Sequence, residues 1–346
     1  MTVYIHVDEL RRFTKEVFQK VGVSEDGAEI IADHFAFTNL RGIDSHGIMR
    51  TPYYIKAYED GLINPKPKIR IIREGKNYAL IDGDKSLGHI PAMRATELAI
   101  KKAKESGISI VGVVNLRHVG ALSHYVSKVV EKGFIGISIA NASPRMAMIG
   151  FKKAIVGTNP ISIGFPRENE PPIILDMATS VVAMGKIALA AKKGERVPNG
   201  WGINKDGKVT NDPKEIIEGS VLPMGGYKGF GLAIAIDILC GIVLGGEYGL
   251  KMERTLFSQG GFIISAIDIN TFRPHKDYLK EIEEYVNLLK STPTMDNVEV
   301  ILAGELEYKT SQERIHKGIP IDNGVFKELL ELSKKMNVKS LKSLIA

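Results

Sequence analysis

Between residues 69 and 140, short β-branched runs alternate with longer helical segments, and this alternation constrains the fold more than any other feature. Residues 108–114 form an unbroken apolar run, which is typical of a strand covered on both faces. Helices are predicted on either side of it, over 91–105 and about 121–132, and a strand follows at 134–140. Alternation of this kind predicts a layered α/β core.

Further elements are predicted before and after this region. Strands are expected at 69–72, 78–81, 161–165, 173–175 and 262–267, and helices at 180–193, 229–244, 278–289 and 324–336. The segment 229–244 is apolar along its whole length, which predicts a buried helix.

Residues 7–40 predict two amphipathic helices, with Ser24 as the N-cap of the second. A third helix is expected within 46–60, where Pro52 permits two starting points. If the helix begins near Thr51, Pro52 occupies the first turn, where its missing N–H is harmless. If it begins before His46, Pro52 bends it.

The segment 40–54 concentrates side chains suited to a small anion that exchanges a proton. An imidazole such as His46 titrates near neutral pH, and a guanidinium such as Arg50 holds a carboxylate through two hydrogen bonds. Ser45 and Tyr54 add hydroxyl groups. In an unbroken helix, His46, Arg50 and Tyr54 would share one face. The alternative interpretation is a capped helix start with a hydrogen-bonded histidine.

Two glycine-containing segments have both a functional and a structural interpretation. Residues 225–231 include Lys228 and lead into the apolar helix, so they could cradle a phosphate or simply let that helix pack tightly. Residues 157–160 could contact a ligand or form a turn.

Two titratable residues are expected at strand ends. Asp176 ends an apolar run, where it could orient a histidine or cap the helix predicted over 180–193. His118 follows the run at 108–114, so it could face a crevice or lie in an exposed loop.

Composition restricts the other function classes. The net charge of +6 could indicate nucleic acid, but lysines alternate with glutamates along the helices, which favours solvated faces. Cys240 is the single cysteine and lies in an apolar run, which favours a reduced thiol and a cytoplasmic protein. We expect no signal peptide, because charged helix-like sequence follows the N-terminus, and no membrane span, because the longest apolar stretch is short and carries Asp237. We expect no metal site, because the histidines are dispersed. Abundant Lys, Glu and Ile are typical of thermophilic proteins.

Four motifs occur in the order found in one known family: Leu-Arg-Gly-x-x-Ser-His-Gly at 40–47, Gly-Thr-Asn-Pro at 157–160, Leu-Asp-Met-Ala-Thr at 175–179 and Lys-Gly-Phe-Gly at 228–231. From about residue 8 to about 335, the chain resembles the malate/L-lactate dehydrogenase family, which is distinct from the Rossmann enzymes. The usual Gly-x-Gly-x-x-Gly fingerprint is absent, and the resemblance explains why.

The resemblance implies an α/β fold in which a layered mixed sheet forms a non-Rossmann NAD(P)-binding fold. A helical domain would comprise residues 1–75, joined by C-terminal helices at about 300–346. The NAD(P)-binding domain would cover 76–299. The resemblance also implies a homodimer with active sites near the subunit interface.

The resemblance implies roles for individual residues. It places His46 and His118 at the reacting centre, either being the possible proton donor, with Ser45 and Asp176 supporting His46. The expected substrate contacts are Arg50, Tyr54 and Ala142. The expected cofactor contacts, with NAD or NADP, are Gly157, Thr158, Asn159, Pro160, Asp176, Met177, Ala178, Tyr227, Lys228, Gly229, Thr255, Leu256 and Phe257.

The expected reaction is hydride transfer between NAD(P)H and a small anionic 2-oxo acid of the malate, lactate or sulfolactate type. One alternative is reduction of a cyclic imine such as piperideine- or pyrroline-2-carboxylate. Another is oxidation of ureidoglycolate, although Ala142 stands where ureidoglycolate dehydrogenases carry a serine, unless Ser143 substitutes for it. A basic nucleic-acid-binding protein is the rival from a different class.

Overall fold

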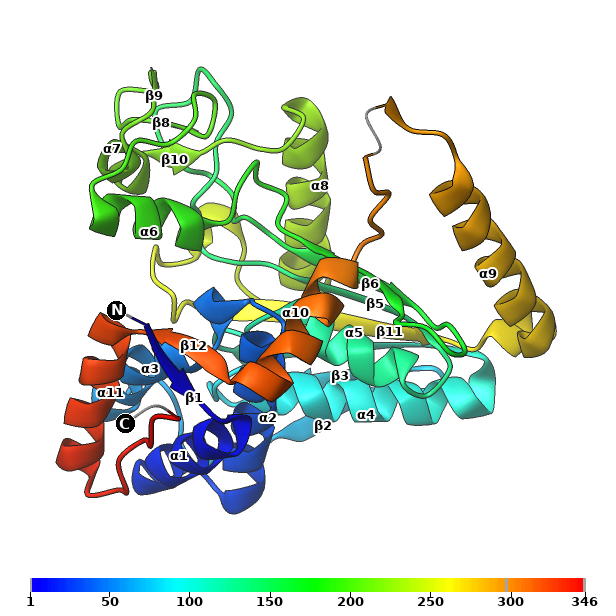
Figure 1. Ribbon diagram of the computed structural model, residues 1–346, viewed down its shortest axis with the longest axis horizontal. Helices are drawn as coiled ribbons and strands as arrows, with labels where there is room; N and C mark the ends of the chain where they lie inside the picture. The colour runs from blue at the N-terminus through cyan, green and yellow to red at the C-terminus, as the bar shows by residue number, and fades with distance from the viewer. Residues whose placement is uncertain (1, 296–297, 345–346) are drawn as a thin grey trace.

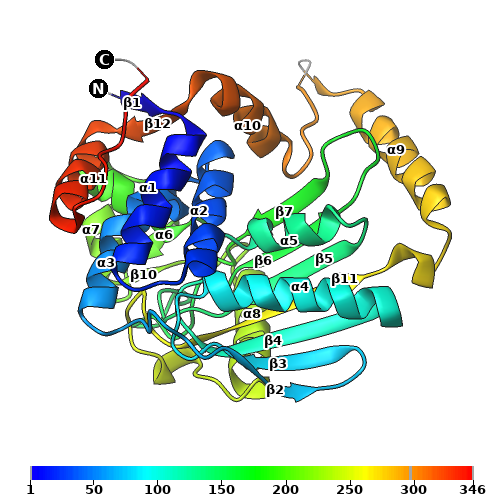
Figure 2. The ribbon, with the colours of Figure 1, turned by 90° about the horizontal axis from the view of Figure 1, so that it is seen from below.

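The computed structural model describes residues 2–295 and 298–344, and a seven-stranded mixed sheet lies at its centre. The strand order is β2-β3-β4-β11-β5-β6-β7, as Figure 2 shows. Only β3 and β4 pair in parallel; the other neighbours are antiparallel. The strands are β2 (Arg70–Glu74), β3 (Tyr78–Asp82), β4 (Ile108–Leu116), β5 (Ile135–Ala140), β6 (Ile161–Phe165), β7 (Ile173–Met177) and β11 (Gly260–Ile267).

Helices cover both faces of this sheet, which confirms the layered α/β prediction. On one face lie α4 (His89–Ser106) and α5 (Leu122–Val130). On the other lies α8 (Tyr227–Asp237), which continues as a π-helix over Ile238–Val243 (Figure 1).

Two predictions of complete burial are wrong on this second face. In β4, Ile110 is 49% exposed, and its partner Tyr78 in β3 is 43% exposed. The π-helix covers only the next part of the strand, where Leu244 packs on Gly112. The outer side of the same helix is open as well, because none of the described residues forms a further layer over it: Ile242 is 52% exposed.

The N-terminal segment folds as predicted into two helices, α1 (Val7–Lys20) and α2 (Glu25–Leu40). Ser24 caps the second helix, because its hydroxyl accepts a hydrogen bond from the amide of Gly27.

The third helix, α3 (Thr51–Glu59), follows the first of the two alternatives. It begins at Thr51, with Pro52 in its first turn. Two short 3-10 turns, Asp44–His46 and Ile48–Arg50, precede it. Ser45 therefore does not cap this helix, and the three side chains at 46, 50 and 54 do not share a helical face.

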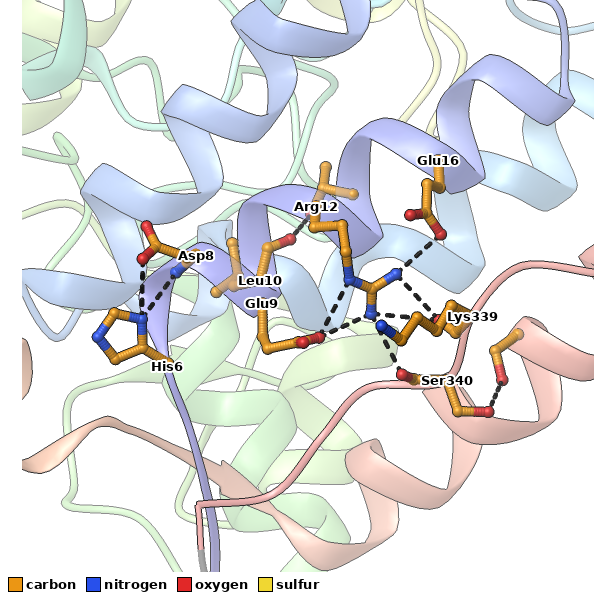
Figure 3. Close-up of polar contacts among 10 residues, drawn as sticks. His6, Asp8, Glu9, Leu10, Arg12, Glu16, Lys339 and Ser340 are labelled. Carbon is orange, nitrogen blue, oxygen red and sulfur yellow. Dashed lines mark hydrogen bonds and ion pairs between the residues drawn. The ribbon is translucent and has the colours of Figure 1, made fainter.

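The two ends of the chain meet beside these helices. β1 (Thr2–Ile5) pairs with β12 (Ile319–Asp322), and α11 (Asn323–Met336) packs against α1 and α3. Arg12 of α1 donates hydrogen bonds to the carbonyls of Lys339 and Ser340 (Figure 3). Glu9 and Glu16 hold the same guanidinium. The sequence reading missed both strands and α10 (Glu305–Lys317) as a separate helix.

The division into residues 1–75 with 300–346 and 76–299 stays a prediction, and one apolar cluster runs from α1 into the sheet. A smaller lobe, seen above the sheet in Figure 1, has an apolar cluster of its own around Ile187 and Ile216. It contains α6 (Met184–Lys193), α7 (Pro213–Glu218), β8 (Gly202–Ile203), β9 (Val209–Thr210) and β10 (Ser220–Val221).

The remaining elements are α9 (His275–Ser291), which extends away from the body in Figure 1, and 3-10 turns at Gly249–Lys251 and Ile269–Thr271. Among the described residues, no helix combines the length and the apolar character needed to cross a membrane.

Candidate active site

The two 3-10 turns before α3 bring the side chains of His46 and Arg50 to Ser45. The Ser45 hydroxyl lies 2.9 Å from Nδ1 of His46. Arg50 Nε donates a 2.7 Å hydrogen bond to the Ser45 carbonyl oxygen. The His46 ring stacks against the His118 ring, with centroids 5.7 Å apart. The chain thus brings these residues together by turn geometry rather than by a common helical face.

His118 lies just beyond the end of β4, and it is not an exposed loop histidine. Its Nδ1 lies 2.7 Å from the Tyr54 hydroxyl and accepts a 3.3 Å hydrogen bond from the amide of Gly120. Because a backbone N–H can only donate, the neutral ring must carry its proton on Nε2. Tyr54 then donates to Nδ1 as well.

Burial keeps both imidazoles neutral. It lowers the pKa of His46 to about 4, and the charge of Arg50 contributes further. Burial also lowers the pKa of His118, assisted by His46 and Arg50. Tyr54 is fully buried, which raises the pKa of its phenol, so the hydroxyl stays protonated beside His118. As residues, His46 and His118 are nevertheless only partly buried.

Five of the eight histidines form a continuous cluster that starts at this pair. The ring of His89 lies 6.3 Å from His118 and 4.3 Å from His34, and His124 lies 4.8 Å from His34. Sequence reasoning missed this cluster because its members come from five separate segments. Within the described part of the chain, no three histidine, cysteine or carboxylate groups are placed to bind a metal.

Hydrogen bonds fix the proton positions in the inner part of the cluster. His34 Nε2 accepts from the amide of Ala121 at 3.0 Å, so the neutral ring carries its proton on Nδ1. That nitrogen lies 3.0 Å from Nδ1 of His124 and donates to it. His89 is fully buried, and neither of its ring nitrogens has a partner among the described residues.

We expect the stability of the protein to fall in mild acid because His89 is buried as a neutral ring. Burial lowers its pKa from 6.5 to about 3, so the unfolded chain binds a proton below pH 6.5 that the folded chain rejects. At pH 5 this linkage amounts to roughly 2 kcal/mol for one histidine. Between pH 7 and pH 5, the wild type should therefore lose about 2 kcal/mol more unfolding free energy than His89→Leu. Equal losses in urea titrations of the two proteins would contradict this account.

Gly120 joins His118 to the inner cluster and tolerates no side chain. Its φ is +75°, and a Cβ there would lie 2.2 Å from His34 Nε2 and 2.7 Å from His89 Nε2. We expect Gly120→Ala to cost about 1–2 kcal/mol in backbone strain and about 1–3 kcal/mol more in steric overlap. Gly61→Ala is the matched control, because φ is +72° there and no atom lies within 4 Å. Equal unfolding free energies for the two variants would refute the overlap.

Asp176 lies in β7, and no hydrogen bond joins its carboxylate to His46 among the described residues, so its support of His46 stays a prediction. Its carboxylate accepts a 3.0 Å hydrogen bond from the amide of Ser123. Asp176 is exposed, but the neighbouring chain displaces enough water to raise its pKa, and the hydrogen bonds from Ser123 oppose this shift. The capping interpretation is wrong, because α6 begins at Met184 with Ala183 as its N-cap.

Two of the predicted cofactor segments are hydrogen-bonded to each other. The amide of Thr179, just after the 176–178 segment, donates to the Thr158 carbonyl at 3.0 Å. Asn159 is buried between two neighbours: its side chain accepts from the amide of Ala142 at 2.9 Å and donates to the Ala233 carbonyl at 2.8 Å. Its amide group therefore holds the segment to α8 and is not free to bind a ligand.

At the glycine-rich start of α8, the structure confirms the packing interpretation, and the phosphate-cradle interpretation stays a prediction. Gly229 is required for packing, because a Cβ there would lie 2.4 Å from the Met224 carbonyl oxygen. Gly225 and Gly226 have φ values of +56° and +61° and are exposed. Lys228 is exposed in the first helical turn, where the helix dipole favours anions. The amides of residues 228–230 in that turn already donate to the carbonyls of residues 224–226.

The segment 255–257 reaches the reacting side chains through Phe257, whose ring lies 6.2 Å from the Tyr54 ring. Arg117, adjacent to His118, donates a 2.5 Å hydrogen bond to the Phe257 carbonyl and a 2.9 Å bond to that of Leu62. Arg117 thus ties two loops to the end of β4, a role that sequence reasoning did not assign.

Together, a hydroxyl–imidazole pair, a phenol–imidazole pair and a guanidinium form a candidate enzyme site for small anionic molecules. The sequence model described as malate/L-lactate dehydrogenase matches residues 5–330. Malate dehydrogenase of Pyrococcus horikoshii is 40% identical, over 98% of this chain and 97% of that protein. L-sulfolactate dehydrogenase of Methanocaldococcus jannaschii is 39% identical, over 93% and 94%.

Solved structures agree with these sequence comparisons. Malate dehydrogenase of Entamoeba histolytica superposes with a TM-score of 0.94 at 31% identity, covering 98% of this chain and 99% of that one. The chain belongs to the malate/L-lactate dehydrogenase family, and its mixed sheet has the fold of that family.

Proposed function

We propose that this protein is a nicotinamide-dependent dehydrogenase that interconverts small 2-hydroxy acids and 2-oxo acids. The observation that carries the proposal is the convergence of Ser45–His46, Tyr54–His118 and Arg50 at one place. Its membership of a dehydrogenase family supports the same conclusion.

Arg50 is the proposed carboxylate ligand. Its Nε is engaged with the Ser45 carbonyl, whereas neither Nη atom has an acceptor among the residues that the structure describes. Those two groups can therefore bind a carboxylate in parallel. A carboxylate held there would also offset the positive charge that helps to lower the pKa of His46, which favours proton uptake when substrate binds.

His46 is the proposed proton donor in reduction and acceptor in oxidation. The cofactor, when bound, supplies or accepts the hydride. When His46 gains a second proton, its Nδ1 can donate to the Ser45 hydroxyl, which is free to rotate and accept. On His118 the second proton would go to Nδ1, where it would be repelled by the Gly120 N–H that already donates to this atom. We therefore assign His118 to a hydrogen bond from Nε2 to the substrate oxygen.

The proposed cofactor contacts are the backbone of 157–160, the segment 176–178, residues 227–229 and the segment 255–257. The packing of 157–160 against Thr179 and α8 supports this grouping. Melting temperatures measured with NAD and with NADP test it and distinguish the two cofactors. A rise with neither would contradict the proposed site.

A substrate panel tests the reaction itself: malate, lactate, sulfolactate, ureidoglycolate and diketogulonate, each with both cofactors. Turnover of none of these, together with turnover of piperideine-2-carboxylate, would establish the cyclic-imine alternative, for which the same Arg50 and His46 would serve. Ureidoglycolate is disfavoured, because Ser143 is only 8% exposed and does not take the place of the more accessible Ala142.

We also infer that the protein is a homodimer. α8 and the π-helix present an open apolar face of 41–65% exposed side chains, a large surface for a monomer to leave in water. The face comprises Ile234, Ile238, Leu239, Ile242 and Val243. Light scattering should give twice the chain mass, and Ile242→Glu should lower it. A cytoplasmic location, which the single buried thiol of Cys240 favours, is part of the same proposal.

A further inference from the structure

Helix α10 lies along the backbone that leads into the Ser45–His46 turn. Figure 1 shows it in orange beside α2, and the two helices are in contact. At its start, the Gly304 carbonyl accepts a hydrogen bond from Arg41. In its middle, Thr310 approaches Gly42, where an added Cβ would lie 3.3 Å from its methyl group. The first half of the helix therefore contacts the loop at Arg41 and Gly42.

Arg314, near the end of this helix, makes the most specific of these contacts. Its Nη1 and Nη2 donate to the two carboxylate oxygens of Asp44 at 2.7 and 3.0 Å. Nη1 also donates to the Asn39 carbonyl oxygen at 2.5 Å. The Arg314 side chain is 15% exposed and the Asp44 side chain is 40% exposed, so the guanidinium is shielded from solvent while the carboxylate is partly open to it. A fork-to-fork pair of this kind fixes direction as well as distance.

Asn39 extends this contact to the other side of the turn. Its amide nitrogen donates to Asp44 at 2.7 Å, and its amide oxygen accepts from the backbone of Ile48 at 2.8 Å. Asn39 is 1% exposed. Asp44 and Ile48 flank Ser45, His46 and Gly47, so one buried amide and one guanidinium hold both ends of the turn that carries the proposed proton donor.

We propose that Arg314 is a positioning residue for His46, acting through Asp44 and Asn39. This inference rests on the proposed function, because it takes His46 as the group that exchanges the substrate proton. Removing the guanidinium leaves the Asp44 carboxylate without its strongest partner, one residue from Ser45. The turn then loses its defined orientation, and a displacement of about 1 Å at a reacting group can cost on the order of 10²-fold in rate.

Arg314→Met is the test variant, and Lys317→Met is its matched control. Lys317 lies on the same helix and pairs with Glu313 in an exposed i,i+4 contact, and it makes no hydrogen bond or ion pair with the described residues of the turn. With the best substrate of the panel, we expect Arg314→Met to lower kcat about 10–100-fold, with the KM for the cofactor within about twofold of wild type. Arg314→Lys should recover part of kcat, since it keeps the charge but not the fork. Lys317→Met should match wild type.

Hydrogen exchange of the amides at 44–48 gives a readout that does not depend on activity. Exchange should be faster in folded Arg314→Met and unchanged in Lys317→Met. The inference is overturned if kcat stays within about twofold of wild type in folded Arg314→Met, or if exchange at the turn is unchanged. An inactive wild type would instead refute the proposed function, while the exchange comparison would still decide the role of Arg314.

Discussion

Replacing His46 with asparagine should lower kcat for 2-oxo-acid reduction by about 10²–10⁴-fold, the usual contribution of a well-placed general acid. Asparagine can keep a polar contact with Ser45, but it cannot supply a proton. The KM for the cofactor should change little, because no predicted cofactor contact involves this side chain. Steady-state kinetics with saturating cofactor measure both quantities.

His118→Asn and His316→Asn complete this comparison. His316 is exposed on α10, so its variant should have wild-type kinetics. His118→Asn retains a donor and should lose less than His46→Asn. If His46→Asn keeps near-normal turnover while His118→Asn does not, the two histidines have the opposite roles.

The second large effect is expected from Arg50→Gln. Losing one partner of a shielded charge pair costs roughly 2–5 kcal/mol. In kcat/KM for the acid substrate this corresponds to about 30–5000-fold. Most of the loss should appear as a raised KM for the acid, because Arg50 binds the carboxylate throughout the reaction. A smaller fall in kcat is expected too, since Arg50 Nε also holds the Ser45 carbonyl.

Arg50→Lys and Arg70→Gln are informative companions. Lysine keeps the charge but not the planar fork, so its kcat/KM should lie between those of wild type and glutamine. Arg70 is 75% exposed in an ion pair on an edge strand, and its loss should leave kinetics unchanged. If Arg50→Gln leaves the KM for the acid unchanged, the carboxylate is bound elsewhere.

The strands and helices around the sheet could be predicted from sequence because their apolar periodicity is local. For example, the strand predicted over 161–165 has the same bounds as β6. Burial was harder to predict, because whether Ile110 or Ile242 is covered depends on layers that the pattern of one segment does not contain. The short strands β8, β9 and β10 carry too few residues to show a period.

The candidate site shows a different limit. The four-residue spacing of His46, Arg50 and Tyr54 pointed to neighbours in space because it assumed one helix through all three. The helix begins only at Thr51, with Pro52 in its first turn, so His46 and Arg50 lie before it. Nothing local marks His34 or His89 as neighbours of His118, since only tertiary packing brings their rings together. Asn39 and Arg314 were missed for the same reason.

The ion pair between Asp44 and Arg314 joins residues 270 positions apart in the chain. At synthesis rates of about 5–20 residues per second, the ribosome takes roughly 15–50 s to reach Arg314 after Asp44 has emerged. During that interval the nascent chain can form α1, α2 and α3, yet it lacks the guanidinium proposed to position His46. Premature termination before α10 should therefore lower turnover at least as much as Arg314→Met does, even though every proposed catalytic side chain is present.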